Sequence, residues 1–239
     1  MTQVNKDKFK IYKNVFDQFT LGTLFKLSSQ GHFEELVSPI KIGKESNIFI
    51  AETKEAEYVI VKIYRLQSCN FNKMFSYIKS DPRFMSIKNQ RRQVIFKWVQ
   101  REYRNLLAAR EKINVPTPYV FSNNVIVMES IGKDIPAPQL KDQYPKDIEG
   151  FVSKILHSVM ELCKLGLVHG DLSEFNILNH DETPFFIDFS QSTSVKDASA
   201  QDYMKRDLKN LKRFFLKMKY EIDTDAEFEK LKKEMIKYH

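Results

Sequence analysis

The chain has few of the residues that cross-link or stiffen a fold. In 239 residues it contains two cysteines, one tryptophan, seven glycines and eight prolines. Cys69 and Cys163 stand in unlike contexts without metal-ligand spacing, so neither a disulfide framework nor a zinc module is expected. A reducing cytoplasm is the simplest location for such cysteine usage.

Long apolar runs are missing too. No stretch reaches the ~18 consecutive apolar residues of a membrane-spanning helix, and the start, MTQVNKDKFK, lacks the apolar region of a signal peptide. Apolar residues make up 42% and charged residues 29% of the chain, as in folded proteins. We therefore expect a folded monomer that does not bind membranes.

Positive charge is in excess and unevenly spread. The formal net charge is +7, and from Arg65 to Arg110 eleven lysines and arginines face two acids. Such a stretch is either a solvated basic surface or an electrostatic footprint for a polyanion such as RNA. The sequence leaves both interpretations open.

The apolar pattern predicts strands early in the chain. Residues 15–37 predict short helices that end at Pro39. Alternating β-branched residues predict strands within 39–64 and at 125–128. Between them, residues 93–113 predict an amphipathic helix. Its inward face carries apolar residues and one carboxylate: Ile95, Trp98, Val99, Glu102, Leu106 and Ala109.

The sequence pattern predicts mainly helices in the second half of the chain. After a proline-rich connector, KDIPAPQLKDQYP, residues 147–166 predict an amphipathic helix. A short strand, FFIDF, and two helices follow, the last opened by a capping box at Thr224 and Glu227. The order predicts an α+β chain with a mixed N-terminal lobe and a helical C-terminal lobe.

Two charges of opposite sign fall on inward faces. Lys62 is the one charge in the strand YVIVKIY, and Glu102 lies four residues after Trp98 on its helix. Each alone could be a solvated side chain. Paired, they would offset the cost of each other's burial and leave the lysine available for phosphates.

The turn KIGKESNIF between two predicted strands has one glycine, so it matches no Gly-rich nucleotide motif. Gly43, backbone N–H groups and the Ser46 hydroxyl could still hold a phosphate. An ordinary hairpin turn is the other interpretation.

The segments LVHGDLSEFNIL and PFFIDFS place three polar groups beside apolar runs. Asn176 follows Asp171 by five positions, and Asp188 follows twelve later. Protein-kinase catalytic loops have this Asp-to-Asn spacing: the Asp accepts a hydroxyl proton and the Asn holds a metal. The pattern predicts Mg-ATP as the common partner, with His169 bracing the loop.

These motifs together resemble the RIO-type atypical serine/threonine protein kinases, specifically the first subfamily. The similar segments are GKESNIF, IVKIYR, QREYRNL, HGDLSEFNIL and IDFSQS, and they extend over nearly the whole chain. Gly170 replaces the arginine of ordinary kinases, Ser190 replaces the glycine of Asp-Phe-Gly, and no Ala-Pro-Glu follows. An activation segment and peptide-docking helices are therefore not expected.

The resemblance implies a compact, two-lobed protein-kinase-like α+β fold with an antiparallel sheet in the N-lobe and a small helical C-lobe. The expected parts are an N-terminal helical segment (1–38), an N-lobe (39–131) with a basic insert at about 65–92, and a C-lobe (132–239). It also implies ATP with Mg²⁺ or Mn²⁺ as cofactors, and a role in small ribosomal subunit maturation as a kinase or ATPase switch, with a pre-ribosomal particle or its RNA as partner.

Site roles follow from the same resemblance. Asp171, Lys62 and Asp188 are expected to be catalytic, and Asn176 and Asp188 to bind the metal. Nucleotide contacts are expected from the residues of the phosphate turn, the ion pair and the connector between lobes: Ile42, Gly43, Lys44, Ser46, Lys62, Glu102, Glu129 and Ile131.

Two other functions stay open. Small-molecule phosphotransferases of the aminoglycoside and choline kinase type carry a similar motif, but the 51 residues after Asp188 leave little room for their larger C-lobe. A non-catalytic, nucleotide-gated RNA-binding scaffold would keep the same residues without turnover.

Overall fold

A computed structural model describes residues 16–67, 70–80, 90–132 and 135–237 of the chain. The chain divides into two compact units. Unit 1 comprises Met1–Tyr103 with Pro118–Asp134, and unit 2 comprises Arg104–Thr117 with Ile135–His239. The lobe boundaries expected from the sequence stay predictions.

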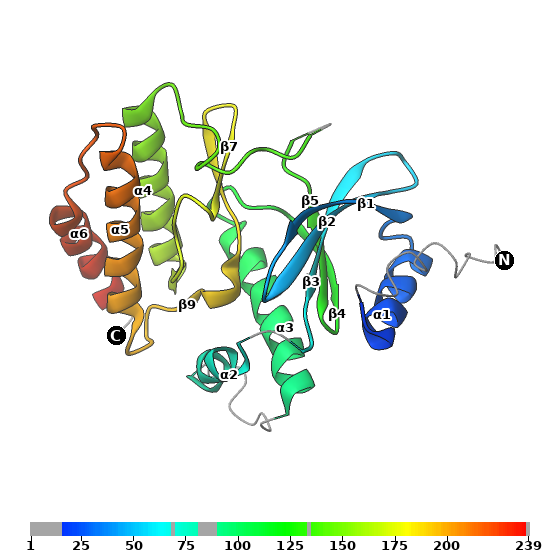
Figure 1. Ribbon diagram of the computed structural model, residues 1–239. Helices are drawn as coiled ribbons and strands as arrows, with labels where there is room; N and C mark the ends of the chain where they lie inside the picture. The colour runs from blue at the N-terminus through cyan, green and yellow to red at the C-terminus, as the bar shows by residue number, and fades with distance from the viewer. Residues whose placement is uncertain (1–15, 68–69, 81–89, 133–134, 238–239) are drawn as a thin grey trace. The chain divides into compact units, whose positions relative to one another are not determined.

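Unit 1 is built on a five-stranded antiparallel sheet (Figure 1). Its strands, in spatial order, are β1 (Glu35–Ile42), β2 (Ser46–Glu52), β3 (Tyr58–Tyr64), β5 (Val125–Glu129) and β4 (Pro118–Ser122). The strands predicted within 39–64 and at 125–128 are confirmed.

One face of this sheet is covered by helix α1 (Gln18–Ser29), as Figure 1 shows. Leu24 and Leu27 of α1 are buried in one cluster with Val61 of β3. The expectation of helices up to residue 37 is wrong at its end, because β1 begins at Glu35. Pro39 lies inside β1, where the pairing with β2 shifts; an edge strand tolerates its missing N–H.

The opposite face of β3 is buried near the strand's end. The pattern of burial alternates at first, but the last four residues, Val61 to Tyr64, are all buried. Helix α3 (Arg91–Ala109) supplies the cover, and its predicted inward residues, including Glu102, are buried. Helix α2 (Phe71–Ser80) packs on α3 through an edge-to-face contact of Tyr77 with Trp98. Lys62 therefore points into a protein interior.

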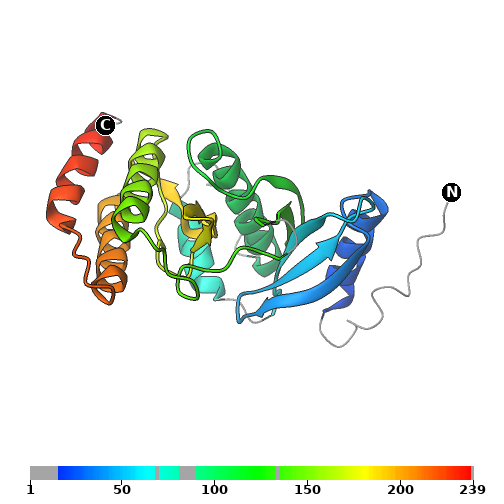
Figure 2. The same ribbon diagram turned by 90° about the horizontal axis from the view of Figure 1, so that it is seen from above.

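Unit 2 contains α4 (Ile148–Lys164), α5 (Ala200–Leu216) and α6 (Thr224–Ile236), with α6 in contact with both others. Figure 2 shows the three helices side by side, in yellow-green, orange and red. Asp223, one residue earlier than expected, caps α6 by accepting a hydrogen bond from the Ala226 N–H. None of the helices in the described ranges is long and apolar enough to cross a membrane.

Unit 2 also contains two small antiparallel pairs of strands. One joins β6 (Leu167–Val168) to β9 (Thr193–Ser194), and the other is the hairpin of β7 (Ile177–His180) and β8 (Thr183–Phe186). The β7–β8 turn consists of Asp181 and Glu182, both with positive φ. Two consecutive left-handed residues match the right-handed twist of a tight hairpin. The polar segments singled out in the sequence lie at the ends of these strands.

Candidate active site

The predicted phosphate turn joins β1 and β2 in unit 1. The Gly43 N–H donates to the Ser46 carbonyl oxygen over 3.0 Å, and a Cβ at Gly43 would stand 2.8 Å from that oxygen. Only glycine allows so close an approach. Ile42 and Lys44 are exposed on either side of Gly43.

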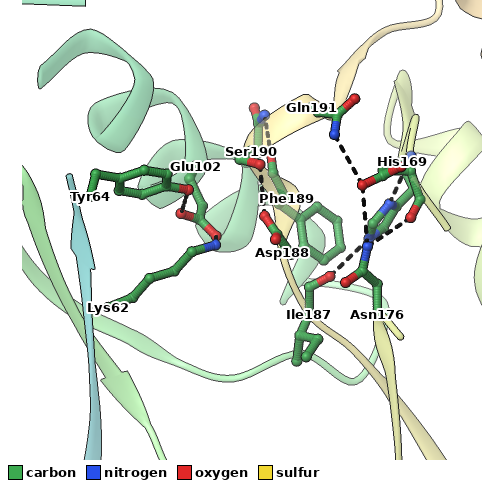
Figure 3. Close-up of polar contacts among 12 residues, drawn as sticks. Lys62, Tyr64, Glu102, His169, Asn176, Ile187, Asp188, Phe189, Ser190 and Gln191 are labelled. Carbon is green, nitrogen blue, oxygen red and sulfur yellow. Dashed lines mark hydrogen bonds and ion pairs between the residues drawn. The ribbon is translucent and has the colours of Figure 1, made fainter. Parts of the chain in front are cut away.

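Lys62 and Glu102 form the ion pair that the sequence predicts. The Lys62 Nζ lies 2.7 Å from Glu102 Oε1, and both side chains are almost fully buried. The Tyr64 hydroxyl donates to the other oxygen, Oε2, over 2.6 Å (Figure 3). Both oxygens of the glutamate are thus held, one by a cation and one by a neutral donor.

Loss of the lysine from this pair should destabilise unit 1. In Lys62→Met the Glu102 charge stays buried without its cation, which costs about 3–5 kcal/mol of the free energy of unfolding. The double variant Lys62→Met/Glu102→Gln removes both charges and should recover a large part of the loss. Urea unfolding of the three proteins measures this; equal stability of the two variants would contradict it.

Glu129 and Ile131 also lie in unit 1. Glu129 is the last residue of β5, and Ile131, two positions later, is buried. Their backbone groups follow the end of a strand, which is the position expected for the adenine contact. That contact stays a prediction.

The residues of the predicted catalytic loop lie in unit 2, after β6. His169 Nδ1 accepts from the Asp171 N–H over 3.3 Å, and its Nε2 lies 3.1 Å from the Ile187 carbonyl oxygen. These partners fit a neutral ring protonated at Nε2. Its ring also packs on Phe189, with centroids 4.8 Å apart. The bracing role predicted for His169 is confirmed.

The β7–β8 hairpin brings Asn176 and Asp188 together. The Ile187 N–H donates to the Asn176 carbonyl oxygen over 3.0 Å, so Asn176 stands opposite the residue before Asp188. The predicted strand FFIDF is shorter than expected and ends at Phe186. Asp188 follows in a left-handed conformation, with φ 64°, which bends the chain away from β7.

The donor atoms here suit a hard divalent cation. The Asn176 Nδ2 donates to the Asp171 carbonyl oxygen over 2.8 Å, so its amide oxygen lies on the other side of the amide group from that contact. Asp188 adds a carboxylate whose Oδ1 accepts from the Ser190 hydroxyl over 2.7 Å. An all-oxygen set of few protein ligands is what Mg²⁺ prefers. No group of three or more His, Cys, Asp or Glu side chains that could hold a metal occurs among the described residues.

Asp207 of α5 supports the loop from behind. Its Oδ2 accepts from the Gly170 N–H over 2.8 Å and its Oδ1 from the Leu172 N–H over 2.9 Å. The Arg206 guanidinium donates to the Gly170 carbonyl oxygen. Burial raises the pKa of Asp207 to about 7, against the lowering effect of these two N–H donors. One buried carboxylate thus holds the backbone on both sides of Asp171.

The raised pKa of Asp207 should make stability depend on pH. Because the folded pKa, about 7, exceeds the ordinary 3.8, the contribution of Asp207 is complete below pH about 4 and is lost as pH rises through about 7. The difference in free energy of unfolding between wild type and Asp207→Asn should therefore shrink over that range. Urea unfolding at several pH values tests this, and a constant difference would contradict it.

Three residues of the site were not predicted by the sequence analysis: Asp207, Tyr64 and Gln191. Asp207 follows the inward position Met204 by three residues and precedes Leu208, so a carboxylate on an apolar helix face was the available signal. No comparable signal marks Tyr64, because tyrosine is common in β-strands. Gln191, whose Nε2 donates to Asp171 Oδ2 over 3.0 Å, depends on a turn that no local pattern predicts (Figure 3).

Comparison with known proteins identifies the family of this chain. A family model described as the RIO domain matches residues 47–229. The RIO-type serine/threonine-protein kinase Rio1 of Methanocaldococcus jannaschii is 41% identical over 241 residues, which cover 97% of this chain and 83% of the relative. Rio1 of Haloferax volcanii is 36% identical, with 93% and 78% covered.

The fold is also similar to a solved structure. The crystal structure of the Rio2 kinase–ADP/Mg²⁺–phosphoaspartate complex from Chaetomium thermophilum has a TM-score of 0.67 and 24% sequence identity. It is matched over 87% of this chain and 65% of that chain. The expected kinase-like α+β fold is confirmed. The chain belongs to the RIO domain family and is an atypical serine/threonine protein kinase.

Proposed function

We propose that this kinase transfers the γ-phosphate of ATP with Mg²⁺ as cofactor, acting as a protein kinase, an ATPase switch, or both. Lys62, aligned by Glu102, holds the nucleotide phosphates, and Asp171 accepts or orients the proton of the attacking group. Asn176 and Asp188 hold the metal, which neutralises phosphate charge when bound. The turn residues Ile42, Gly43, Lys44 and Ser46 cover the phosphates, while Glu129 and Ile131 bind adenine.

The observation that carries this proposal is the assembly around Asp171. Its carboxylate accepts from Gln191, and its backbone oxygen accepts from Asn176, which stands across the hairpin from Ile187. These contacts support the proposal, in which Asp171 is the proton acceptor and Asn176 and Asp188 are the oxygen ligands that phosphoryl transfer requires.

A covalent intermediate is part of the proposal. The Rio2 complex contains ADP, Mg²⁺ and a phosphoaspartate. We propose that Asp188 of this chain is phosphorylated in the same way, since its carboxylate is one of the two proposed oxygen ligands, with Asn176. Turnover would then need no added protein acceptor.

The biological setting proposed is maturation of the small ribosomal subunit, by a monomer in the cytoplasm. The support is the excess of basic residues between Lys62 and Glu102, forty positions apart. Arg91, Arg92 and Lys97 of α3 are exposed, whereas Arg101 is fully buried and belongs to the interior. Lys88, another basic residue of the insert, lies outside the described residues.

Charge reversal at Arg91, Arg92 and Lys97 should weaken RNA binding and reduce the dependence of that binding on salt. Each phosphate contact to single-stranded RNA contributes about 0.7 to the slope of log affinity against log salt. Arg91→Glu/Arg92→Glu/Lys97→Glu should therefore flatten the slope by about 2, with ATP affinity unchanged. Filter binding of ribosomal RNA at several salt concentrations measures it. An unchanged slope would mark the basic stretch as a solvated surface.

One assay separates the three candidate functions. The protein is incubated with labelled ATP and either pre-ribosomal particles, an aminoglycoside, or no acceptor. Labelled phosphoprotein or released phosphate supports the RIO kinase proposal, and a labelled aminoglycoside supports the small-molecule alternative. RNA binding without any ATP turnover supports the scaffold.

A further inference from the structure

The side-chain amide of Gln191 contacts the carboxylate that the proposed function makes catalytic. Its Nε2 lies 3.0 Å from Asp171 Oδ2, and the residue is 8% exposed. An ionised carboxylate only accepts hydrogen bonds, so the amide nitrogen, and not its oxygen, must face Asp171. A shielded hydrogen bond to a charged acceptor is stronger than one between neutral groups.

The other amide near Asp171 acts differently. The Asn176 Nδ2 lies 2.8 Å from the Asp171 backbone oxygen but 3.5 Å from Oδ2 of its carboxylate. Asn176 therefore holds the main chain of the loop, and Gln191 holds the side chain. The two amides have separate effects on one residue.

The turn that carries Gln191 is itself held from two sides. The Asn105 Nδ2 donates to the carbonyl oxygens of Phe189, over 3.2 Å, and of Ser192, over 2.9 Å. The Ser192 hydroxyl donates to the Val168 carbonyl oxygen over 2.8 Å. The residues on both sides of Gln191 are thus fixed, one of them to the strand that leads into the catalytic loop.

Gly170 lets this turn lie against the loop. Its φ is +77°, and a Cβ there would stand 2.9 Å from the Gln191 carbonyl oxygen. A larger residue would push the turn away and lengthen the Gln191–Asp171 contact. The glycine that replaces the arginine of ordinary kinases thus has a steric reason in this fold.

We infer that Gln191 is a positioning residue for phosphoryl transfer: its amide holds the Asp171 carboxylate in the orientation in which it meets the attacking group. The inference rests on the proposed function of Asp171. In this role Gln191 contacts neither the nucleotide nor the metal. Its loss should therefore lower the turnover number and leave ATP affinity alone.

The test uses two substitutions of nearly the same size. Gln191→Met removes the donor, and Gln191→Glu replaces it with a second negative charge. Loss of a hydrogen bond to a charged group should lower kcat about tenfold to a hundredfold in Gln191→Met, and further in Gln191→Glu. The Kd for ATP, measured by competition with a fluorescent ATP analogue, should stay at the wild-type value. Gln143→Met, at an exposed glutamine of the same unit, is the matched control.

A double-mutant cycle shows whether Gln191 acts through Asp171. Gln191→Met should reduce the residual turnover of Asp171→Ala by less than about twofold, because the carboxylate it positions is gone. An equal fractional loss in both backgrounds, or full activity of Gln191→Met alone, would overturn the inference. Full activity of Asp171→Ala would instead overturn the proposed function.

Discussion

Replacement of Asp171 by alanine is expected to lower ATP turnover by about 10²–10⁴-fold, the usual contribution of a positioned proton acceptor. The fold should survive, because the loop backbone is held by other residues. Asp207 accepts the N–H groups on both sides of Asp171, and Asn176 holds its carbonyl oxygen. Release of labelled phosphate and thermal unfolding together measure the two effects.

Asp142→Ala is the matched control for this substitution. Asp142 is an exposed carboxylate of the same unit, paired with Lys141 at 2.8 Å, and exposed pairs contribute little to stability. Its turnover should equal that of the wild type. Full activity of Asp171→Ala would contradict the role of Asp171, and a loss of activity accompanied by a lowered unfolding temperature would indicate a structural role.

The buried ion pair was predictable because it breaks a pattern. A lysine in an apolar strand and a glutamate on an apolar helix face are each costly alone, so a pairing follows from elementary electrostatics. The hairpin β7–β8 was half predicted: the sequence indicated a strand at FFIDF, but neither β7 nor the end of β8 at Phe186 was expected. The left-handed backbone of Asp188 ends the strand, and no residue type near it signals that bend.

The residues that support the site could not be found in the same way. Asp207 lies 36 positions after Asp171, and Asn105 lies 84 before Phe189, so tertiary packing alone creates their contacts. The spacing that identified Asp171 and Asn176 is local, within one loop. Local patterns therefore predicted the groups to which we assign the chemistry, whereas the groups that contact and support them became apparent only in the fold.

Asp188 is suited to accept the phosphate itself. Its carboxylate is half-buried between Ile187 and the fully buried Phe189, and Ser190 donates to its Oδ1. A carboxylate oxygen can attack the γ-phosphorus of ATP; the bond to the β–γ bridging oxygen breaks, and ADP leaves with the electron pair. Water then hydrolyses the acyl phosphate and restores the carboxylate. A nucleophile that belongs to the site has the advantage of proximity over a free acceptor.

We therefore expect slow, Mg²⁺-dependent turnover without added protein acceptor, with label trapped on Asp188. The protein is incubated with labelled ATP, quenched in acid, and treated with hydroxylamine, which cleaves acyl phosphates and leaves phosphoserine intact. Asp188→Asn, which tolerates the left-handed backbone better than alanine would, should carry no hydroxylamine-labile label. Asp181→Asn is the matched control, since Asp181 is an exposed carboxylate with φ 49° in the neighbouring turn, and it should label like the wild type. Label that resists hydroxylamine, or that persists in Asp188→Asn, would leave Asp188 a metal ligand alone.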